Sequence, residues 1–212
     1  MMETISYLIS HADLFLEATV EHAALVASTL LIASAVAAAI TLACLQSRRA
    51  ANAAVELLGA FYSIPSIALF ALLIPLTGLG ETTAVIVMLA YCQFILVRNA
   101  LEGLNGIDPA IIEASRGLGM TPAQTLLRIR LPLAAPAIIA GLRMAAISCV
   151  GIATVAATIN AGGLGSVLFS GLRTLNVPKI LGGTVCCVAL ALAIDALLRA
   201  VERLVFARTG LR

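Results

Sequence analysis

Residues 108–132 read DPAIIEASRGLGMTPAQTLLRIRLP and form a polar interruption between long apolar runs. Asp108 and Thr121 each precede a proline, and each can cap a helix whose first residue is that proline. Thr121 and Gln124 also have the spacing of a capping box, in which each side chain reaches the backbone N–H of the other residue. The stretch therefore predicts two short helices in succession.

Two further features of the stretch indicate how these helices are joined and where they end. Gly117 and Gly119 lie between the two helices, where a chain reversal requires residues that tolerate positive φ. Leu131-Pro132 is expected to end the second helix, because a residue before proline is disfavoured in the α region. We expect a compact helix–turn–helix outside the apolar part of the protein.

The same stretch resembles the EAA loop of ABC-importer permeases, whose pattern is E-A-A, three residues, G, nine residues and I-x-L-P. The match begins at Glu113, and Ser115 in place of the second alanine is its one departure. An ordinary loop with capped helices would not explain the full spacing. The resemblance implies that this loop docks on an ATPase, through Glu113, Ala114, Ser115, Gly117, Gly119, Ile129, Leu131 and Pro132.

Composition indicates a polytopic, all-α membrane protein. Of the 212 residues, 61% are hydrophobic and 11% are charged, whereas a soluble domain carries about 25% charged residues. The net charge of +2 does not favour nucleic acid as a partner. The five cysteines lie in apolar runs without a C-x-x-C, and there are two histidines. We therefore predict buried cysteines, no metal site and no cofactor.

Five apolar runs are long enough to cross a bilayer, which takes about 20 helical residues. The second run contains two prolines, and a membrane tolerates the carbonyls that prolines leave unpaired only where protein or a water-filled cavity covers them. A Gly-rich connection over 160–178 precedes the last run. The expected spans are 23–45, 55–76, 83–101, 133–159 and 180–198.

The chain is expected to divide into three parts. Residues 1–22 carry apolar residues at helical spacing and predict an amphipathic segment, which could lie at the membrane surface or form a lid. Residues 23–205 form the membrane domain, which includes the polar loop 108–132. Residues 206–212 form a basic tail.

Basic residues are distributed unevenly and predict the orientation. If residues 108–132 are cytoplasmic, Arg173 and Lys179 are the basic residues left outside, which agrees with the positive-inside rule. Five spans then place the N-terminus outside and the C-terminus in the cytoplasm. The arginines on the inner side would be Arg48, Arg49, Arg98, Arg116, Arg128, Arg130, Arg199, Arg203, Arg208 and Arg212.

Nearly the whole chain resembles ABC permeases of type I, with a methionine-importer-like membrane domain, and it is most similar to the osmoprotectant group. This further resemblance rests on the segments 64–66, 73–80, 98–99, 107–109 and 161–165. It implies a non-catalytic permease subunit in a bacterial cytoplasmic membrane that imports glycine betaine, choline or carnitine by alternating access. The implied partners are an ABC ATPase dimer, an extracytoplasmic substrate-binding protein and a second permease subunit, identical or paralogous, within the lipid. An amino acid or another small solute is the alternative cargo.

Polar residues within the spans are candidates for the translocation path, because polar groups inside a membrane are costly. Hydrogen bonding between helices would explain the same residues equally well. Arg143 is either part of a structural ion pair or a gate element, and Asp195 has the spacing to pair with Arg199. The candidates are Tyr62, Ser63, Ser66, Tyr91, Gln93, Asn99 and Arg143.

Three rival readings find little support in the sequence: a nucleotide site, an intramembrane enzyme and a structural assembly factor. The run Gly162-Gly163-Leu164-Gly165 follows an apolar span rather than a strand and lacks a P-loop lysine, so we expect a turn and not a nucleotide site. An intramembrane enzyme would need paired acids, a Ser/Lys or His cluster, or H-E-x-x-H in the spans, and the sequence contains none of these. A structural assembly factor would leave the EAA spacing unexplained.

Overall fold

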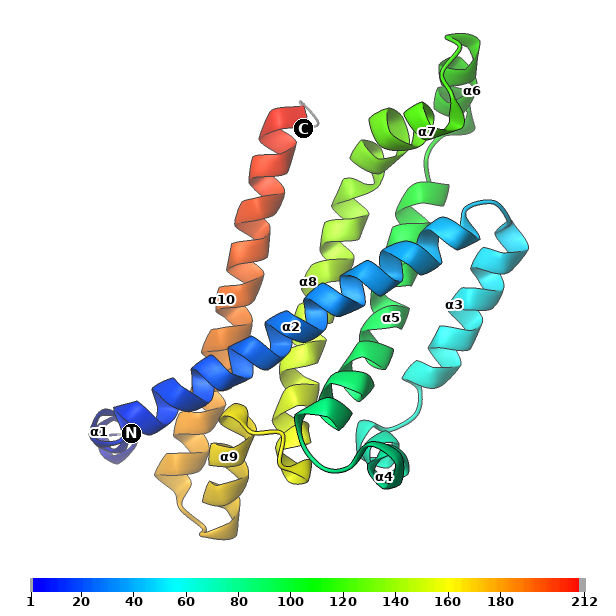
Figure 1. Ribbon diagram of the computed structural model, residues 1–212. Helices are drawn as coiled ribbons and strands as arrows, with labels where there is room; N and C mark the ends of the chain where they lie inside the picture. Colours follow the sequence, from blue (N-terminus) through cyan, green and yellow to red (C-terminus); the bar gives the residue numbers. More distant parts are fainter. Residues whose placement is uncertain (1, 210–212) are drawn as a thin grey trace.

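The computed structural model describes residues 2–209, and helices make up most of this range (Figure 1). Long helices lie side by side, while short helices lie at both ends of the bundle. The elements are α1 (Met2–Ser10), α2 (Ala12–Cys44), α3 (Arg48–Tyr62), α4 (Ser66–Thr77), α5 (Glu81–Asn105), α6 (Pro109–Gly117), α7 (Pro122–Thr125), a π-helical turn (Leu126–Arg130), α8 (Leu131–Ala156), a 3-10 turn (Ala157–Ile159), α9 (Gly163–Arg173) and α10 (Val177–Thr209).

The all-α, multi-span class is confirmed within this range. Four helical stretches are long and apolar enough to cross a membrane, and α3 with α4 makes up to a fifth span. The span expected over 55–76 is broken in the structure, since α3 and α4 meet at an angle of 90°. Pro65 adopts an extended ψ of 134° at this break. The Tyr91 hydroxyl donates to the Ile64 carbonyl, which satisfies an acceptor next to the break.

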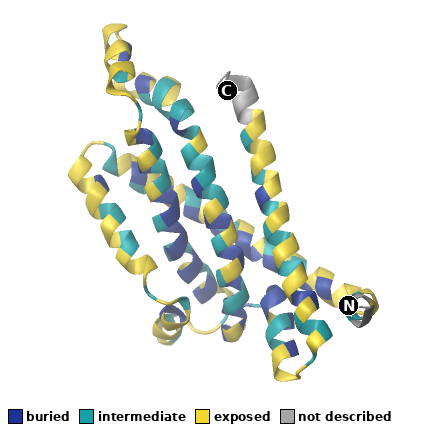
Figure 2. Ribbon diagram, turned by 180° about the vertical axis from the view of Figure 1, so that it is seen from behind, coloured by how far each residue is buried: buried dark blue, intermediate teal, exposed yellow. Residues whose placement is uncertain are grey.

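The centre of the bundle is the contact between α5 and α8, and Figure 2 shows buried residues recurring along both helices. The two backbones approach closely at glycines: a Cβ on Gly103 would lie 2.7 Å from Ala137 Cβ, and one on Gly141 would lie 2.6 Å from Asn99 Cβ. Cys92 and Cys149 are fully buried here, with their Sγ atoms 3.0 Å apart. The prediction of buried cysteines is confirmed for this pair.

Helix α2 crosses the bundle diagonally (Figure 1) and packs on α5, α8 and α9. It runs without a break from Ala12, so the first span has no helix boundary at residue 23. Polar contacts fix its crossing: Gln93 Nε2 donates to the Ala33 carbonyl at 3.2 Å, and His22 Nε2 lies 3.2 Å from the Val150 carbonyl oxygen. The first span and the preceding amphipathic residues are therefore one helix from Ala12 onward.

The Gly-rich connection over 160–178 contains a helix, α9, that the sequence did not predict. Gly162 and Gly163 have φ of 79° and 68°, and the Glu21 carboxylate of α2 accepts the Gly163 N–H at 2.7 Å. Gly163 and Gly165 lie against α2 and the end of α8, where a Cβ would collide. The glycines therefore allow a buried helix to pack closely, and helix propensity alone did not reveal it.

Ion pairs join α8 to α10. Arg143 Nε lies 2.7 Å from Asp195 Oδ1, and Arg143 Nη1 lies 3.3 Å from Glu202 Oε2. Asp195 also binds Arg199 at 2.6 Å, as the i,i+4 spacing indicated. Of the tail predicted over 206–212, the helix α10 includes residues up to Thr209, and residues 210–212 lie outside the described part of the chain.

Candidate functional site

The segment 108–132 forms two short helices that project beyond the bundle (Figure 1). Asp108 Oδ1 accepts the Ala110 N–H at 2.9 Å and caps α6, whose first residue is Pro109. The capping box of α7 is complete: Gln124 Oε1 accepts the Thr121 N–H at 2.8 Å, and Thr121 Oγ1 accepts the Gln124 N–H at 3.3 Å. Both helix starts predicted from the sequence are confirmed.

The reversal between α6 and α7 depends on one glycine. Gly119 has a φ of 76°, whereas Gly117 is the last residue of α6. A Cβ on Gly119 would meet nothing within 4 Å, so the requirement for glycine comes from the backbone conformation alone. Leu118, at the tip of the turn, is 82% exposed, so an apolar side chain is available for contact with another protein at the end of this segment.

The two faces of α6 differ. Ser115 is buried, donates to the Ile112 carbonyl at 2.7 Å and lies 3.2 Å from Thr125 Oγ1, so it joins α6 to α7. The serine that departs from the EAA pattern therefore has a structural contact inside the segment. Glu113 and Ala114 are exposed on the outer face. Of the other predicted docking residues, Gly117 and Gly119 are exposed, while Ile129, Leu131 and Pro132 are half-buried.

The expected helix end at Leu131-Pro132 is wrong. Leu131 is helical, with φ −63° and ψ −46°, and its N–H bonds the Leu126 carbonyl across the π-helical turn. A proline lacks an N–H and crowds the carbonyl four residues earlier, and the wider π turn accommodates this without ending the helix. Arg130 Nη2 also donates to the Leu104 carbonyl of α5 at 3.1 Å. The segment is thus joined to α8 by continuous helix and to α5 by a hydrogen bond.

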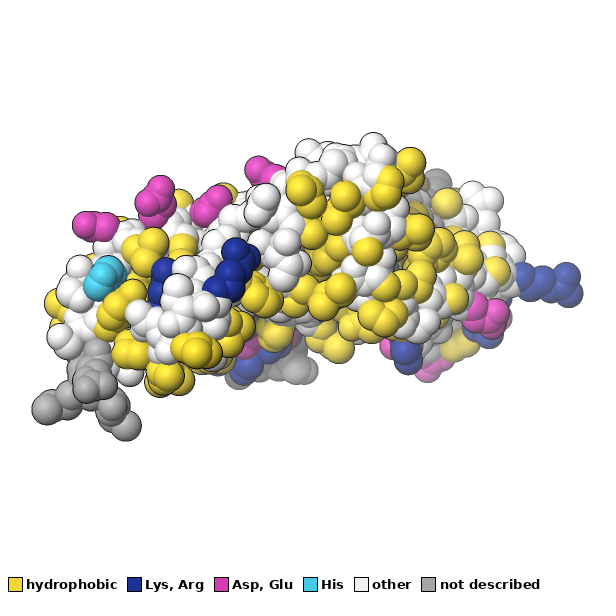
Figure 3. All heavy atoms as spheres, turned by 90° about the horizontal axis from the view of Figure 1, so that it is seen from below, with side chains coloured by type: hydrophobic (Ala, Val, Ile, Leu, Met, Phe, Trp, Pro, Cys, Tyr) yellow, Lys and Arg dark blue, Asp and Glu magenta, His cyan; other side chains and the backbone are white. Residues whose placement is uncertain are grey.

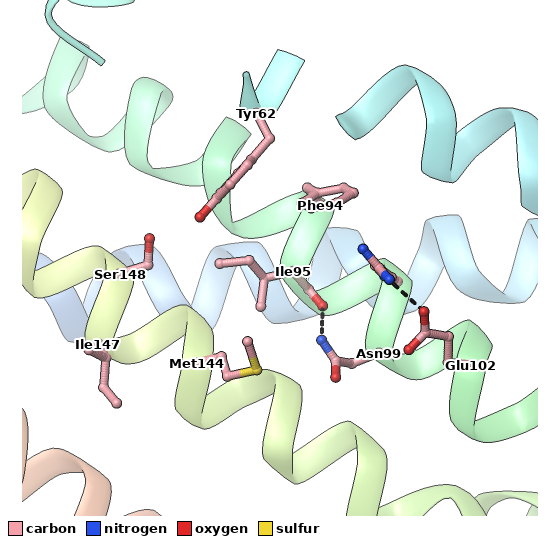
Figure 4. Close-up of a pocket in the computed structure, with 9 residues that line it drawn as sticks. Tyr62, Phe94, Ile95, Asn99, Glu102, Met144, Ile147 and Ser148 are labelled. Carbon is pink, nitrogen blue, oxygen red and sulfur yellow. Dashed lines mark hydrogen bonds and ion pairs between the residues drawn. The ribbon is translucent and has the colours of Figure 1, made fainter. Parts of the chain in front are cut away.

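A second candidate site is an open groove of about 610 Å³ between α3, α5 and α8. Figure 4 shows that Tyr62 and Ser148 reach into it from α3 and α8, on opposite sides of the groove. Its wall on α5 is formed by successive turns of that helix. The lining residues are Tyr62, Phe94, Ile95, Arg98, Asn99, Glu102, Met144, Ile147 and Ser148.

Aromatic rings and one ion pair give the groove its chemical character. The ring centroids of Tyr62 and Phe94 lie 5.0 Å apart. The guanidinium carbon of Arg98 lies 5.7 Å from the Phe94 centroid, within the range of a cation–π contact. Arg98 Nε donates to Glu102 Oε1 at 2.8 Å. The groove therefore offers an aromatic surface beside both signs of charge.

The structure brings two of the residues predicted for the translocation path, Tyr62 and Asn99, to the groove. Ser63, which donates to the Ala60 carbonyl, and Ser66 lie at the break between α3 and α4. The remaining three make contacts between helices: Tyr91 with the Ile64 carbonyl, Gln93 with the Ala33 carbonyl, and Arg143 with α10. In the structure these three residues therefore join helices, which is the alternative to a place on the translocation path.

Sequence reasoning missed most of the groove. Phe94, Arg98 and Glu102 are spaced by four residues and share one face of α5. That spacing, together with the Arg98–Glu102 charge pair inside an apolar helix, could have predicted from the sequence a polar site on this face of α5. Met144, Ile147 and Ser148 gave none, because only the packing of α8 against α5 brings them there. Among the described residues, no three His, Cys, Asp or Glu side chains come together as a metal site.

Residues 25–209 match the family described as "Binding-protein-dependent transport system inner membrane component". The chain belongs to this family. Membership agrees with the projecting helical segment and the several apolar spans, and it makes the protein a multi-pass inner-membrane transport component.

Individual relatives of this permease family cover nearly the whole chain. The choline transport system permease protein OpuBB of Bacillus subtilis (strain 168) is 32% identical over 96% of this chain and 94% of its own length. The glycine betaine/carnitine/choline permease OpuCB of the same organism is 31% identical with the same coverage. The osmoprotectant import permease OsmW of Salmonella typhimurium is 32% identical over 95% of this chain and 96% of its own length.

Solved structures share the fold of this permease. The MetNI methionine ABC transporter in an inward-facing conformation matches with a TM-score of 0.73 and 22% identity, over 98% of this chain and 99% of that one. An amino acid ABC transporter with histidines matches with a TM-score of 0.71 and 17% identity, over 93% of this chain and 96% of that one. At these identities the likeness concerns the fold alone.

Proposed function

We propose that this chain is the permease subunit of an ABC importer that moves a small quaternary-amine osmoprotectant into the cytoplasm. The observation that carries the proposal is the exposed segment of α6 and α7, which has the EAA spacing and leaves Leu118 uncovered. The cargo class is taken from the printed names of relatives that align along nearly the whole chain. Glycine betaine, choline and carnitine are the candidate solutes.

In this proposal the α6–α7 end faces the cytoplasm and docks on a dimer of ATPase subunits, which carries out ATP hydrolysis. The permease itself is not catalytic. A second permease subunit, identical or paralogous, completes the membrane unit. The N-terminus lies outside and the C-terminus lies in the cytoplasm, as the arginine distribution indicates.

The opposite end, which carries α9, would receive the extracytoplasmic binding protein. Figure 3 looks at this end and shows acidic side chains along one of its edges. Asp13, Glu17 and Glu21 of α2 line an open hollow there. Glu21 also holds the start of α9, so a protein that docks beside these acids would press on a helix anchored in the bundle.

The proposed mechanism is alternating access. Closure of the ATPase dimer would move α6 and α7 as levers. Two connections support this route: α7 continues through the π turn into α8, and Arg130 binds the Leu104 carbonyl of α5. Since α5 and α8 form two walls of the groove, a change in their relative tilt would open it to one side or the other.

Uptake by the reconstituted importer tests the cargo. Permease, ATPase and binding protein in proteoliposomes are expected to accumulate radiolabelled glycine betaine or choline, with a requirement for both ATP and the binding protein. A complex that instead accumulates an amino acid without a quaternary amine would overturn the cargo and retain the transporter. Uptake that continues without the binding protein would contradict the importer.

Thiol labelling tests the orientation. Single cysteines in place of Ser47 and Thr174, both exposed, lie in connections at opposite ends of the bundle. An impermeant maleimide added to intact cells is expected to label the cysteine at 174 and not the one at 47. The reverse pattern would invert the proposed topology.

A further inference from the structure

We propose that the groove between α3, α5 and α8 binds a zwitterionic solute, with a quaternary ammonium against Tyr62 and Phe94 and a carboxylate on Arg98. This inference rests on the proposed function and deepens it, since it assigns the cargo a place within the permease. It also selects within the cargo class, because it favours solutes that carry a carboxylate over simple cations.

The aromatic half of the site is preorganised. The ring centroid of Tyr62 lies 5.0 Å from that of Phe94, at an interplanar angle of 36°. It lies 5.5 Å from the ring centroid of Tyr91, at an interplanar angle of 61°. Tyr91 is buried and its hydroxyl is bound to the Ile64 carbonyl, which fixes its ring behind Tyr62. Tyr62 itself is 37% exposed and lines the groove. Ring faces held in this way attract a quaternary ammonium through cation–π interaction.

The anionic half of the ligand would meet Arg98. Glu102 accepts a hydrogen bond from Nε of this arginine at 2.8 Å, and within the described residues no hydrogen bond from its two terminal nitrogens is found. Those nitrogens form an end-on fork that suits a carboxylate. The Arg98 side chain is 52% exposed, so a solute in the groove can reach it. Glu102 thus orients the guanidinium and leaves its terminal edge for the ligand.

The charges explain why a zwitterion fits better than a cation. The Arg98 guanidinium already lies 5.7 Å from the Phe94 centroid, so a second positive group on the same aromatic surface would meet like charge. Glu102, bonded to Nε at 2.8 Å, offsets part of that charge, but a cation without an acceptor cannot use the N–H groups of the two terminal nitrogens. A carboxylate a few ångströms from the ammonium cancels this repulsion by binding the guanidinium. A trimethylammonium group joined to a carboxylate by a short chain has this arrangement of charges.

The position of Arg98 also suits a transit site. It lies seven residues before the end of α5, or about 10 Å along the helix axis. A second hollow of about 220 Å³ lies beside the same ion pair, lined by Asn52, Glu56 and Asn105 among others. Arg98 and Glu102 line both hollows. A solute released from Arg98 would therefore pass into a polar space towards the α6–α7 end.

Saturation-transfer NMR on the permease–ATPase complex in nanodiscs, without binding protein, tests the site. The probes are the N-methyl protons of glycine betaine, and choline serves as the comparator without a carboxylate. We expect transfer to glycine betaine at least fivefold stronger than to choline. Arg98→Gln and Phe94→Leu should each reduce the glycine betaine signal at least fivefold. Phe94→Tyr, which keeps a ring, should retain more of the signal than Phe94→Leu. Arg49→Gln, which changes an exposed arginine outside the groove, should leave the signal unchanged.

Three results would contradict the inference: an undiminished glycine betaine signal in both Arg98→Gln and Phe94→Leu, an equal signal for choline, or no signal from the parental complex. Arg98→Lys separates a folding defect from a binding role, since it keeps the charge and should retain part of the signal. A separate uptake measurement distinguishes failure of this inference from failure of the proposed function. It uses proteoliposomes that contain the same complex and its binding protein, with a quaternary amine as the solute. If uptake occurs without groove binding, only this inference fails; if uptake is absent, the proposed function fails.

Discussion

The two ends of the molecule carry short helices of opposite character. At one end α9 is seated in the bundle, with Gly163, Leu164 and Gly165 buried and its first N–H bonded to Glu21 of α2. At the other end α6 projects from the bundle, and Ser115 is its one buried residue. Each end nevertheless has an apolar tip that is almost fully exposed, Leu118 at 82% and Leu175 at 85%.

This difference separates a helix whose position is fixed by the chain itself from a segment that we propose docks on another protein. The buried glycines of α9 set its position through close packing, so a change there should damage the fold. The position of α6 depends on caps, one turn and a single polar contact with α7. Changes on its outer face should leave the fold intact and disturb an interaction with a partner.

The largest effect is expected from Gly165→Val in α9. A Cβ at this position would collide with the Thr154 carbonyl and lie 2.7 Å from Ala157 Cβ. Overpacking typically costs about 1–3 kcal/mol, and a clash with backbone belongs at or above the upper end of this range. We expect little folded protein by fluorescence-detected size-exclusion chromatography. The matched variant Gly151→Val, where a Cβ meets nothing within 4 Å, should elute normally; equal recovery of both would contradict the anchored role of α9.

The next effect concerns the outer face of α6. Glu113→Lys reverses an exposed charge, and Gly119→Val forces a β-branched residue into a positive φ at a backbone cost of about 1–3 kcal/mol. Both proteins should fold and insert, whereas ATP-dependent uptake should fall at least tenfold. Arg49→Glu, which reverses an exposed charge outside α6 and α7, serves as the control. Parental uptake in Glu113→Lys and Gly119→Val would remove α6 from the coupling pathway.

A smaller effect is expected at the contact between α2 and α9. Glu21→Gln keeps an acceptor for the Gly163 N–H but removes its charge, and a hydrogen bond to a charged group is worth about 1.5–3 kcal/mol against about 1 kcal/mol for a neutral one. We expect a modest decrease in thermal stability in detergent. Glu17→Gln, on the same exposed edge of α2, should have no effect. Equal stability of both variants would show that Glu21 does not anchor α9.

The smallest effect is expected from Ser115→Ala. It removes the hydroxyl that lies 3.2 Å from Thr125 Oγ1 and restores the alanine of the EAA pattern. The loss is about 1 kcal/mol of local stability, so hydrogen exchange of α6 amides should accelerate severalfold while uptake stays near the parental rate. A loss of uptake as large as that of Glu113→Lys would mean that Ser115 does more than join the two helices.

The sequence predicted the features that depend on local chemistry. Asp108, Thr121 and Gln124 cap their helices, and Gly119 has the positive φ that the turn requires. It failed where packing decides. Glycines around α9 suggested a loop, because their value lies in a close approach to α2 and α8. Pro132 suggested a helix end, because a π turn that absorbs a proline has no local signature.

The groove was partly predictable, because some of its lining residues are related by local helical spacing. Phe94, Arg98 and Glu102 share a face of α5 by their spacing alone, and Tyr62 was a candidate as a polar residue in a span. Gln93 and Arg143 were equally reasonable from the sequence. Only their partners on α2 and α10 reveal that they join helices.

Photo-cross-linking from the two exposed tips tests the central claim most directly. A benzoylphenylalanine is placed at position 118 or 175, since both leucines are more than four-fifths exposed and lie at opposite ends. On illumination of the assembled importer in proteoliposomes, the probe at 118 is expected to form a covalent adduct with the ATPase subunit, and the probe at 175 is expected to form none. An ATPase adduct from 175 and not from 118 would contradict both the orientation and the assignment of α6 and α7 as the coupling segment.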